Sequence, residues 1–298
     1  MEKEGLSFID KAAVIGIKKK SLQIAETLAA VGIEVLLLGP TKSEVETAIQ
    51  GIGEAIDREI QRWGMTEADK RAILARIKPI DDIKLAAGCK IVIEATGTSF
   101  EEKQAALKAV EENLSDGLAL YIIHISTLSV TEITGGSKLG PKVIGMHFQE
   151  PVPKIPVVEL VRGMQTSDET VTAARELARR LNKTAVEVFE YPGYITTRVI
   201  LPFINEAIYV LMEGIARAED IDTAIKLGYN LPIGPLGLCD SLGLDEVLRR
   251  MENLFEELGD VKFRPCPLLR KMVRAGKLGR STGEGFFKYE KKDAYVRQ

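Results

Sequence analysis

The first half of the chain alternates short, continuously apolar segments with longer amphipathic ones. Residues 12–17 (AAVIGI) and 34–38 (EVLLL) are short and rich in β-branched and aliphatic side chains, which predicts two buried strands. Residues 21–31 between them place their apolar side chains on one side of a helix. Strand, helix and strand in this order form a βαβ unit with parallel strands. The alternation therefore restricts this half to a parallel sheet with helices on both faces.

The alternation continues to about residue 190. We expect further helices over residues 43–63, 66–75, 100–113 and 169–181. We expect further strands over residues 91–93, 118–123, 143–146, 157–161 and 184–188. The sheet should therefore extend beyond the six strands of a Rossmann domain.

The pattern changes after Tyr191-Pro192-Gly193. Helical patterns cover residues 199–216, 220–227 and 245–258, with Pro202 in a first turn, and no strand is convincing after residue 190. A chain of 298 residues suits two domains. We predict a Rossmann-type parallel α/β domain over residues 1–190 that resembles a dinucleotide-binding domain, and an all-helical domain over residues 191–298.

Composition excludes several classes of protein. The chain is 45% hydrophobic and 28% charged, with a net charge of −3, which argues against nucleic acid as a partner. It has no run of 18 apolar residues and no apolar segment of signal-peptide length at its start, so we expect no membrane span. Its three cysteines are far apart and suggest neither a metal site nor a disulfide framework. We expect a cytoplasmic protein.

His147 and Glu159 lie on either side of a turn at residues 151–153. A strand–turn–strand arrangement would bring the two side chains together. A carboxylate bonded to one imidazole nitrogen fixes the tautomer and raises the basicity of the other nitrogen, as a general base requires. From the spacing alone, a packed core histidine beside a glutamate at a strand end is the stronger interpretation.

Several ordered segments resemble the L-3-hydroxyacyl-CoA dehydrogenase family. They are ISTLSVT at 125–131, GMHFQEPVP at 145–153, VELVRG at 158–163, YPGYITTR at 191–198, GPLGLCD at 234–240, GLD at 243–245 and KLGRSTGEGFFKY at 277–289. The resemblance covers nearly the whole chain. It implies oxidation of a 3-hydroxyacyl-CoA to a 3-ketoacyl-CoA with a nicotinamide cofactor.

The resemblance also implies roles for single residues. His147 would remove the proton of the 3-hydroxyl group, Glu159 would hold the histidine, and Ser126 would bind the substrate. Thr197 stands where the family has a substrate-binding asparagine, and its hydroxyl offers a shorter hydrogen-bonding group. Glu150 and His124 also replace family asparagines, and Glu150 places an extra carboxylate near the histidine.

The largest departure from the family is at the dinucleotide loop. The family has G-x-G-x-x-G, whose glycines allow a tight turn, close approach of the pyrophosphate and close helix packing. Here Gly16 remains, while Lys18 and Ser21 replace the second and third glycines. Gly39 stands where the family has its ribose-binding acid. In the family's E-A-x-x-E segment Glu94 remains and Thr98 replaces the second glutamate.

Two interpretations of this loop stay open. Either NAD binding is weak or lost, or Lys18–Lys20 and Lys42 form a positive site for the 2′-phosphate of NADP. The chain is accordingly expected to be either an active 3-hydroxyacyl-CoA dehydrogenase or a silent acyl-CoA-binding relative that acts as a partner subunit. We expect a homodimer, or a heterodimer with a related chain, because residues 199–212 are apolar nearly all round.

Overall fold

The computed structural model describes residues 10–62, 64–97, 99–126 and 128–289. The chain divides into two compact units, Met1–Tyr191 and Pro192–Gln298. None of the helices in the described part of the chain has the length and apolar character of a membrane-spanning segment.

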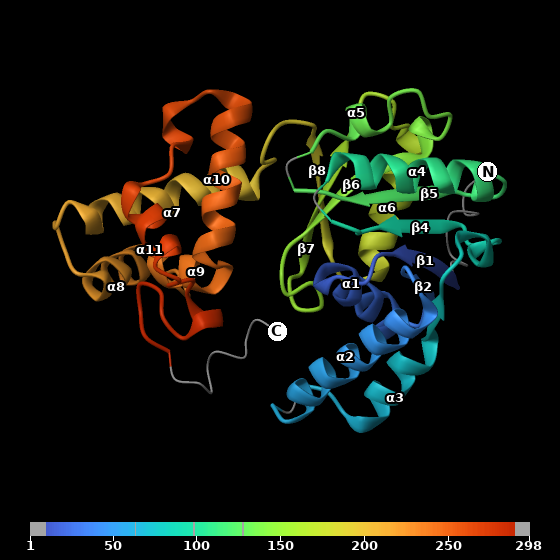
Figure 1. Ribbon diagram of the computed structural model, residues 1–298, viewed down its shortest axis with the longest axis horizontal. Coiled ribbons are helices and arrows are strands. Elements are labelled where there is room, and N and C mark those ends of the chain that lie inside the picture. Colours follow the sequence, from blue (N-terminus) through green and yellow to red (C-terminus); the bar gives the residue numbers. More distant parts are fainter. Residues whose placement is uncertain (1–9, 63, 98, 127, 290–298) are drawn as a thin grey trace. The chain divides into compact units, whose positions relative to one another are not determined.

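Unit 1 is built on one eight-stranded sheet (Figure 1) with the strand order β3-β2-β1-β4-β5-β6-β7-β8. The strands are β1 Lys11–Ile15, β2 Glu34–Leu38, β3 Ile77–Ile80, β4 Ile91–Glu94, β5 Leu120–His124, β6 Val143–Phe148, β7 Val157–Arg162 and β8 Thr184–Phe189. All neighbours pair in parallel except β6 and β7, which are antiparallel. The predicted α/β parallel sheet, larger than six strands, is confirmed, with one antiparallel pair that the prediction did not specify.

One strand was missed by the prediction. β3 consists of Ile77, Lys78, Pro79 and Ile80 and pairs only with β2, at the edge of the sheet. A proline is tolerated at an edge because the missing N–H can face away from the neighbouring strand. Four residues that include a lysine and a proline carry little strand signal.

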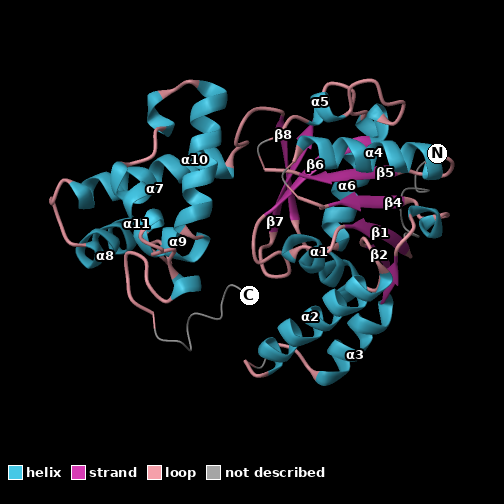
Figure 2. Ribbon diagram, viewed as in Figure 1, coloured by secondary structure: helices cyan, strands magenta, loops and turns pink. Residues whose placement is uncertain are grey.

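Helices flank this sheet (Figure 2) and follow the strands in alternation. They are α1 Lys19–Ala30, α2 Lys42–Ile60, α3 Glu67–Arg76, α4 Phe100–Leu114, α5 Val130–Ile133 and α6 Asp168–Arg180. Apolar side chains of the strands and of α1, α2 and α6 form a continuous buried core. This core fixes the strand ends from which the candidate site is built.

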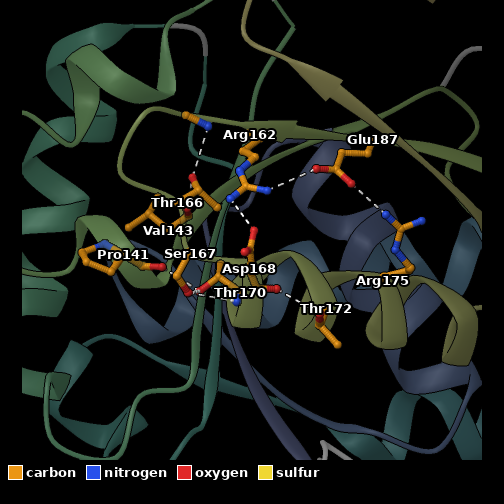
Figure 3. A network of polar contacts seen from close by, with 11 residues as sticks. Pro141, Val143, Arg162, Thr166, Ser167, Asp168, Thr170, Thr172, Arg175 and Glu187 are labelled. Carbon is orange, nitrogen blue, oxygen red and sulfur yellow. Dashed lines mark hydrogen bonds and ion pairs between the residues drawn. The ribbon is translucent and has the colours of Figure 1, made fainter.

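A network of polar contacts anchors one end of the β6–β7 pair (Figure 3). Arg162, the last residue of β7, bonds to Asp168 of α6 at 2.5 Å and lies 3.5 Å from Glu187 of β8. The hydroxyl of Thr166 donates to the carbonyl of Val143, the first residue of β6, at 2.7 Å. These contacts hold the β6–β7 pair against α6 and β8 at the end far from the loop between the two strands.

Unit 2 is helical, with helices α7 Thr196–Met212, α8 Ala218–Tyr229, α9 Pro235–Leu242, α10 Leu244–Leu258 and α11 Pro267–Arg274. Apolar side chains from all five helices share one buried core. The predicted helical second half is confirmed. Two eight-residue helices, α9 and α11, were not predicted, and α7 begins at Thr196, so Pro202 lies inside the helix and not in its first turn.

The end of the described chain is held by one buried carboxylate. Asp240 of α9 accepts hydrogen bonds from the backbone N–H groups of Phe286 and Phe287 and from the Tyr289 hydroxyl, each at 2.9 Å. Burial raises the pKa of Asp240, and these three donors oppose that effect. The segment that resembles the family's C-terminal motif therefore closes over α9.

Candidate active site

His147 and Glu159 face each other across the antiparallel pair β6–β7. They are register partners, and His147 Nδ1 lies 2.6 Å from Glu159 Oε2. Both side chains are buried, with 3% and 1% of the residue surface exposed. An ionised carboxylate only accepts hydrogen bonds, so Nδ1 of a neutral ring carries the proton and Nε2 the lone pair. The arrangement suits a ring that accepts a proton at Nε2 and a carboxylate that stabilises the resulting imidazolium.

His124, the only other histidine of the chain, stacks beside His147. It ends β5, and its ring centroid lies 6.4 Å from that of His147, with 19° between the ring planes. Its Nδ1 lies 3.1 Å from the carbonyl oxygen of Met146, which can only accept, so Nδ1 donates. Burial lowers the pKa of His124 well below its usual range, and the charges of Lys20, His147 and Lys103 act in the same direction. His124 is therefore neutral near pH 7.

Glu150 lies in the loop that follows His147 and contacts the start of α1. Its carboxylate pairs with Lys19 at 2.8 Å and with Lys20 at 3.1 Å. Burial alone would raise the pKa of Glu150, but the two lysines outweigh it and hold the pKa at about 2. The extra carboxylate expected from the sequence is thus ionised, and its nearest partners are the lysines of the dinucleotide loop.

The remaining predicted substrate residues lie in different units. Ser126 follows β5 by two residues and is half-buried, close in sequence to His124. Thr197 is the second residue of α7 in unit 2, and 2% of its surface is exposed. The structure thus joins His147, Glu159 and His124 into one cluster within unit 1, and it places Thr197 on a helix of its own unit.

The first glycine of the dinucleotide loop has a backbone conformation that requires glycine. Gly16 has φ +113°, and a Cβ there would lie 2.9 Å from the carbonyl oxygen of Ala95, so only glycine fits. Lys18 precedes α1 with φ −77° and ψ 165°, and its ammonium lies 3.9 Å from Glu102. Ser21 is fully buried, and its hydroxyl donates to the carbonyl of Lys18 at 2.7 Å. A serine is therefore accommodated at the third glycine position by a bond that braces the turn.

Two other cofactor positions have mainly structural partners. A Cβ on Gly39 would lie 2.6 Å from Val45 Cγ2 and 2.9 Å from Ile17 Cγ2, so neighbouring side chains fill the space of the family's acid. Glu94 is fully buried and bonds to Lys103 at 2.8 Å and to Thr96 at 2.6 Å. Thr98 lies outside the described residues.

The buried partner of Glu94 was missed by the sequence analysis. Lys103 precedes Leu107, Val110 and Leu114 by four, seven and eleven residues, so it lies on the apolar side of α4. A lysine on the buried side of a helix requires a partner of opposite charge, and this spacing was the available signal.

α1 begins without a side-chain cap. The five other helices of unit 1 each begin at a serine or threonine whose hydroxyl accepts a first-turn N–H, whereas Lys18 makes no such bond. The first N–H groups of an uncapped helix have no side-chain acceptor, and they can bind an anionic ligand group such as a pyrophosphate. The turn at Gly16, the uncapped α1 and the lysines therefore fit the charge of a dinucleotide, whereas Lys18 and Gly39 depart from the usual contacts.

Two family models together match almost all of the described chain. The description "3-hydroxyacyl-CoA dehydrogenase, NAD binding domain" matches residues 11–191. The description "3-hydroxyacyl-CoA dehydrogenase, C-terminal domain" matches residues 193–289. Unit 1 is therefore an NAD-binding domain of this family.

Related proteins and solved structures agree with these matches. The chain is 39% identical to a probable 3-hydroxybutyryl-CoA dehydrogenase of Bacillus subtilis. The alignment spans 284 residues and covers 95% of this chain and 99% of the relative. The chain is 37% identical to a 3-hydroxybutyryl-CoA dehydrogenase of Clostridioides difficile over 94% of this chain and 100% of the relative. The crystal structure of (S)-3-hydroxybutyryl-CoA dehydrogenase PaaH1 from Ralstonia eutropha superposes with a TM-score of 0.86 at 38% identity, covering 95% of this chain and 100% of that one. This chain belongs to the 3-hydroxyacyl-CoA dehydrogenase family.

Proposed function

We propose that the protein oxidises an L-3-hydroxyacyl-CoA to the 3-ketoacyl-CoA, with a short acyl chain such as 3-hydroxybutyryl-CoA as substrate. The His147–Glu159 pair carries this proposal, because its buried 2.6 Å contact supplies an oriented base. The relatives named 3-hydroxybutyryl-CoA dehydrogenase support the choice of substrate.

In this reaction the alcohol loses a proton and a hydride. His147 Nε2 accepts the proton of the 3-hydroxyl group, and Glu159 stabilises the imidazolium through Nδ1. A bound nicotinamide supplies the acceptor for the hydride. The hydroxyl groups of Ser126 and Thr197 bind the oxygen atoms of the substrate, with Thr197 offering a single hydroxyl where the family has an amide.

The cofactor is proposed to bind more weakly than in relatives with three glycines. Lys18 carries a side chain where the pyrophosphate would approach the backbone, and its ammonium extends toward Glu102. Gly39 offers no carboxylate to the adenine ribose. Lys42 is the first residue of α2, and its positive charge would complement a 2′-phosphate, which supports NADP as the alternative cofactor.

A silent acyl-CoA-binding subunit is the second candidate function. The side chain of Lys18 at the second glycine position favours it, because a displaced pyrophosphate would misplace the nicotinamide. In that case a related, active chain would supply catalysis.

Calorimetry on the purified chain with NAD, NADP and acetoacetyl-CoA tests both candidates. We expect acetoacetyl-CoA to bind and NAD to bind weakly, and Lys18→Gly to tighten NAD binding by roughly tenfold or more because it removes a steric conflict. Lys18→Ala, which keeps a Cβ at this position, serves as the control. Micromolar binding of NAD to the unmodified chain would contradict the impaired loop, whereas binding of NADP alone would support the basic site.

Turnover decides between the enzyme and the silent subunit. We expect the chain alone to oxidise 3-hydroxybutyryl-CoA when the cofactor is supplied above its dissociation constant. If acetoacetyl-CoA binds but no turnover occurs with saturating NAD or NADP, the dehydrogenase proposal is wrong and the partner-subunit role stands.

A further inference from the structure

Two lysines and one carboxylate join the start of α1 to the loop after β6. Lys19 and Lys20 both bind Glu150, and the ammonium of Lys20 also donates to the carbonyl of Phe148 at 3.2 Å. Phe148 directly follows His147, and Glu150 lies two residues further along. The contacts therefore connect the dinucleotide turn to the end of the strand that carries the proposed base.

Other contacts hold the same loop to α1 and to the residue that precedes β8. The side-chain oxygen of Gln23 accepts the N–H of Val152 at 3.1 Å. Lys183 donates to the carbonyl oxygens of Val152 at 2.6 Å and Ile155 at 2.7 Å. The loop is thus anchored at several points, and Lys20 is the anchor that binds Phe148, the residue after His147.

The charge of Lys20 is poorly screened by solvent. Its side chain is 17% exposed, compared with 42% for Lys19 and 39% for Glu150. The cationic groups that act on the His124 ring are Lys20 from α1, His147 from β6 when protonated, and Lys103 from α4. Burial lowers the pKa of His124 most, and Lys20 contributes the largest charge effect.

The two stacked rings differ in what binds their Nδ1 atoms. His147 Nδ1 faces the carboxylate of Glu159, whereas His124 Nδ1 faces only the carbonyl of Met146. A full negative charge stabilises an imidazolium much more than a carbonyl dipole does. Two imidazoliums with ring centroids 6.4 Å apart would also repel each other, so only one ring should carry the transferred proton.

We propose that Lys20 is a positioning residue of the active site. Held between Glu150 and the carbonyl of Phe148, it fixes the end of β6 against α1, and its positive charge adds to the preference of the transferred proton for His147, which Glu159 already establishes. The proposal rests on the dehydrogenase function for its meaning in catalysis, but its electrostatic part can be measured without turnover.

Nuclear magnetic resonance of the histidine rings provides this measurement, because the untagged chain contains only two histidines. Ring signals are recorded against pH for the unmodified chain and for Lys20→Met, and His124→Asn assigns them. Lys20→Met should move the titration midpoint of His124 upward, because it removes a nearby positive charge. Lys20→Arg, which keeps the charge, should restore the original midpoint.

Lys70→Met is the matched control. Lys70 lies on α3 with its side chain 23% exposed and bonds to Asp57 at 2.5 Å, so it resembles Lys20 in burial and pairing. The Lys70→Met substitution should leave the titration midpoints of both histidines unchanged. Glu150→Gln is a second variant that removes the counter-charge of Lys20, and it should move the His124 midpoint downward.

Kinetic measurements provide a second test, because the loss of a purely structural contact would not change the pH dependence of kcat. In Lys20→Met, kcat should fall on the acid side of the pH profile. His124 becomes protonated there, and the charge of His124 opposes proton uptake by His147. The KM for the acyl-CoA should stay nearly constant. A His124 titration that is identical in Lys20→Met and the unmodified chain would overturn the inference. If the chain is inactive but the His124 midpoint shifts as expected, the dehydrogenase proposal is wrong and the electrostatic role of Lys20 stands.

Discussion

At the scale of single residues, the proposed chemistry assigns the role of general base to His147 and the role of orienting the base to Glu159. Replacing His147 by Gln should lower kcat by about 10²–10⁴, the usual contribution of a positioned general base. Glu159→Gln should cost less, because the ring stays in place while its tautomer and basicity are less controlled. Initial rates of 3-hydroxybutyryl-CoA oxidation measure both effects, and unchanged melting temperatures exclude misfolding.

A His147→Gln variant with near-normal turnover would remove the mechanism as written. A Glu159→Gln variant that loses more activity than His147→Gln would reverse the two roles. Equal losses would indicate that the two side chains act only as a unit.

The close contact of His147 with Glu159 was predictable from sequence, whereas the contacts of Lys20 were not. His147 and Glu159 lie on consecutive strands joined by one loop, so a hairpin brings them face to face. Lys20 and Phe148 are 128 positions apart, and their contact depends on how α1 packs across the sheet. Local patterns contain no information on contacts between residues so far apart in the chain, so the sequence offers a phosphate site for Lys18–Lys20 and not the contact of Lys20 with Phe148.

At the scale of elements, the junction of α1, α2 and the β6–β7 loop contains a titrating carboxyl group. Glu26 of α1 is 9% exposed, and Lys154 of the loop bonds to Glu59 of α2 at 2.6 Å. Burial and the charge of Glu59 raise the pKa of Glu26 from 4.5 to about 7, against the opposing effect of Lys154. The carboxyl group therefore holds a proton in the folded state at pH values where the unfolded chain has released it.

The sign of the pH dependence follows from this difference. Between about pH 4.5 and 7 the folded state binds one proton more at Glu26 than the unfolded state, so the free energy of unfolding falls as pH rises through this window and is constant above it. The total loss is roughly 3 kcal/mol. Glu26→Gln should abolish this part of the slope and make unit 1 more stable than the unmodified chain at pH 8.

Urea unfolding at pH 5 and pH 8 measures the effect. Glu54→Gln, an exposed substitution on α2, is the control and should keep the original slope. If the Glu26→Gln variant loses stability between pH 5 and pH 8 as much as the unmodified chain, Glu26 does not titrate in this window.

The long elements were predictable because their periodicity repeats, and the short ones were not. α6 follows the predicted residues 169–181 within one position because Ser167 caps it and an apolar stripe runs along it. α9 and α11 have eight residues each and begin with a proline after a glycine or a cysteine, which also reads as a turn. Tertiary packing in the core of unit 2 stabilises both helices.

At the scale of the whole molecule, unit 2 exposes large apolar side chains along α7, α8 and the turns that follow them. Val199 is 65% exposed, Ile215 68%, Leu227 79% and Tyr229 74%. α7 buries one side, which includes Leu201, Ile204 and Ile208, in the core of its own unit. Ile200, Tyr209, Val210 and Leu211 of α7 also pack partly against that core, whereas Val199 and Met212 stay exposed near the two ends of the helix.

We predict that a second copy of the chain covers this surface, because burying these side chains removes apolar area from water. Light scattering at micromolar concentration should give the mass of a dimer, about twice 32.7 kDa. Ile215→Asp combined with Leu227→Asp should shift the mass toward the monomer, since it places charges in an apolar contact. Val261→Asp is the control: Val261 is 73% exposed in the same unit but lies on the short turn Val261–Phe263 and not on α7 or α8. A monomeric mass for the unmodified chain would contradict the homodimer and would favour a related chain as the partner that covers α7 and α8.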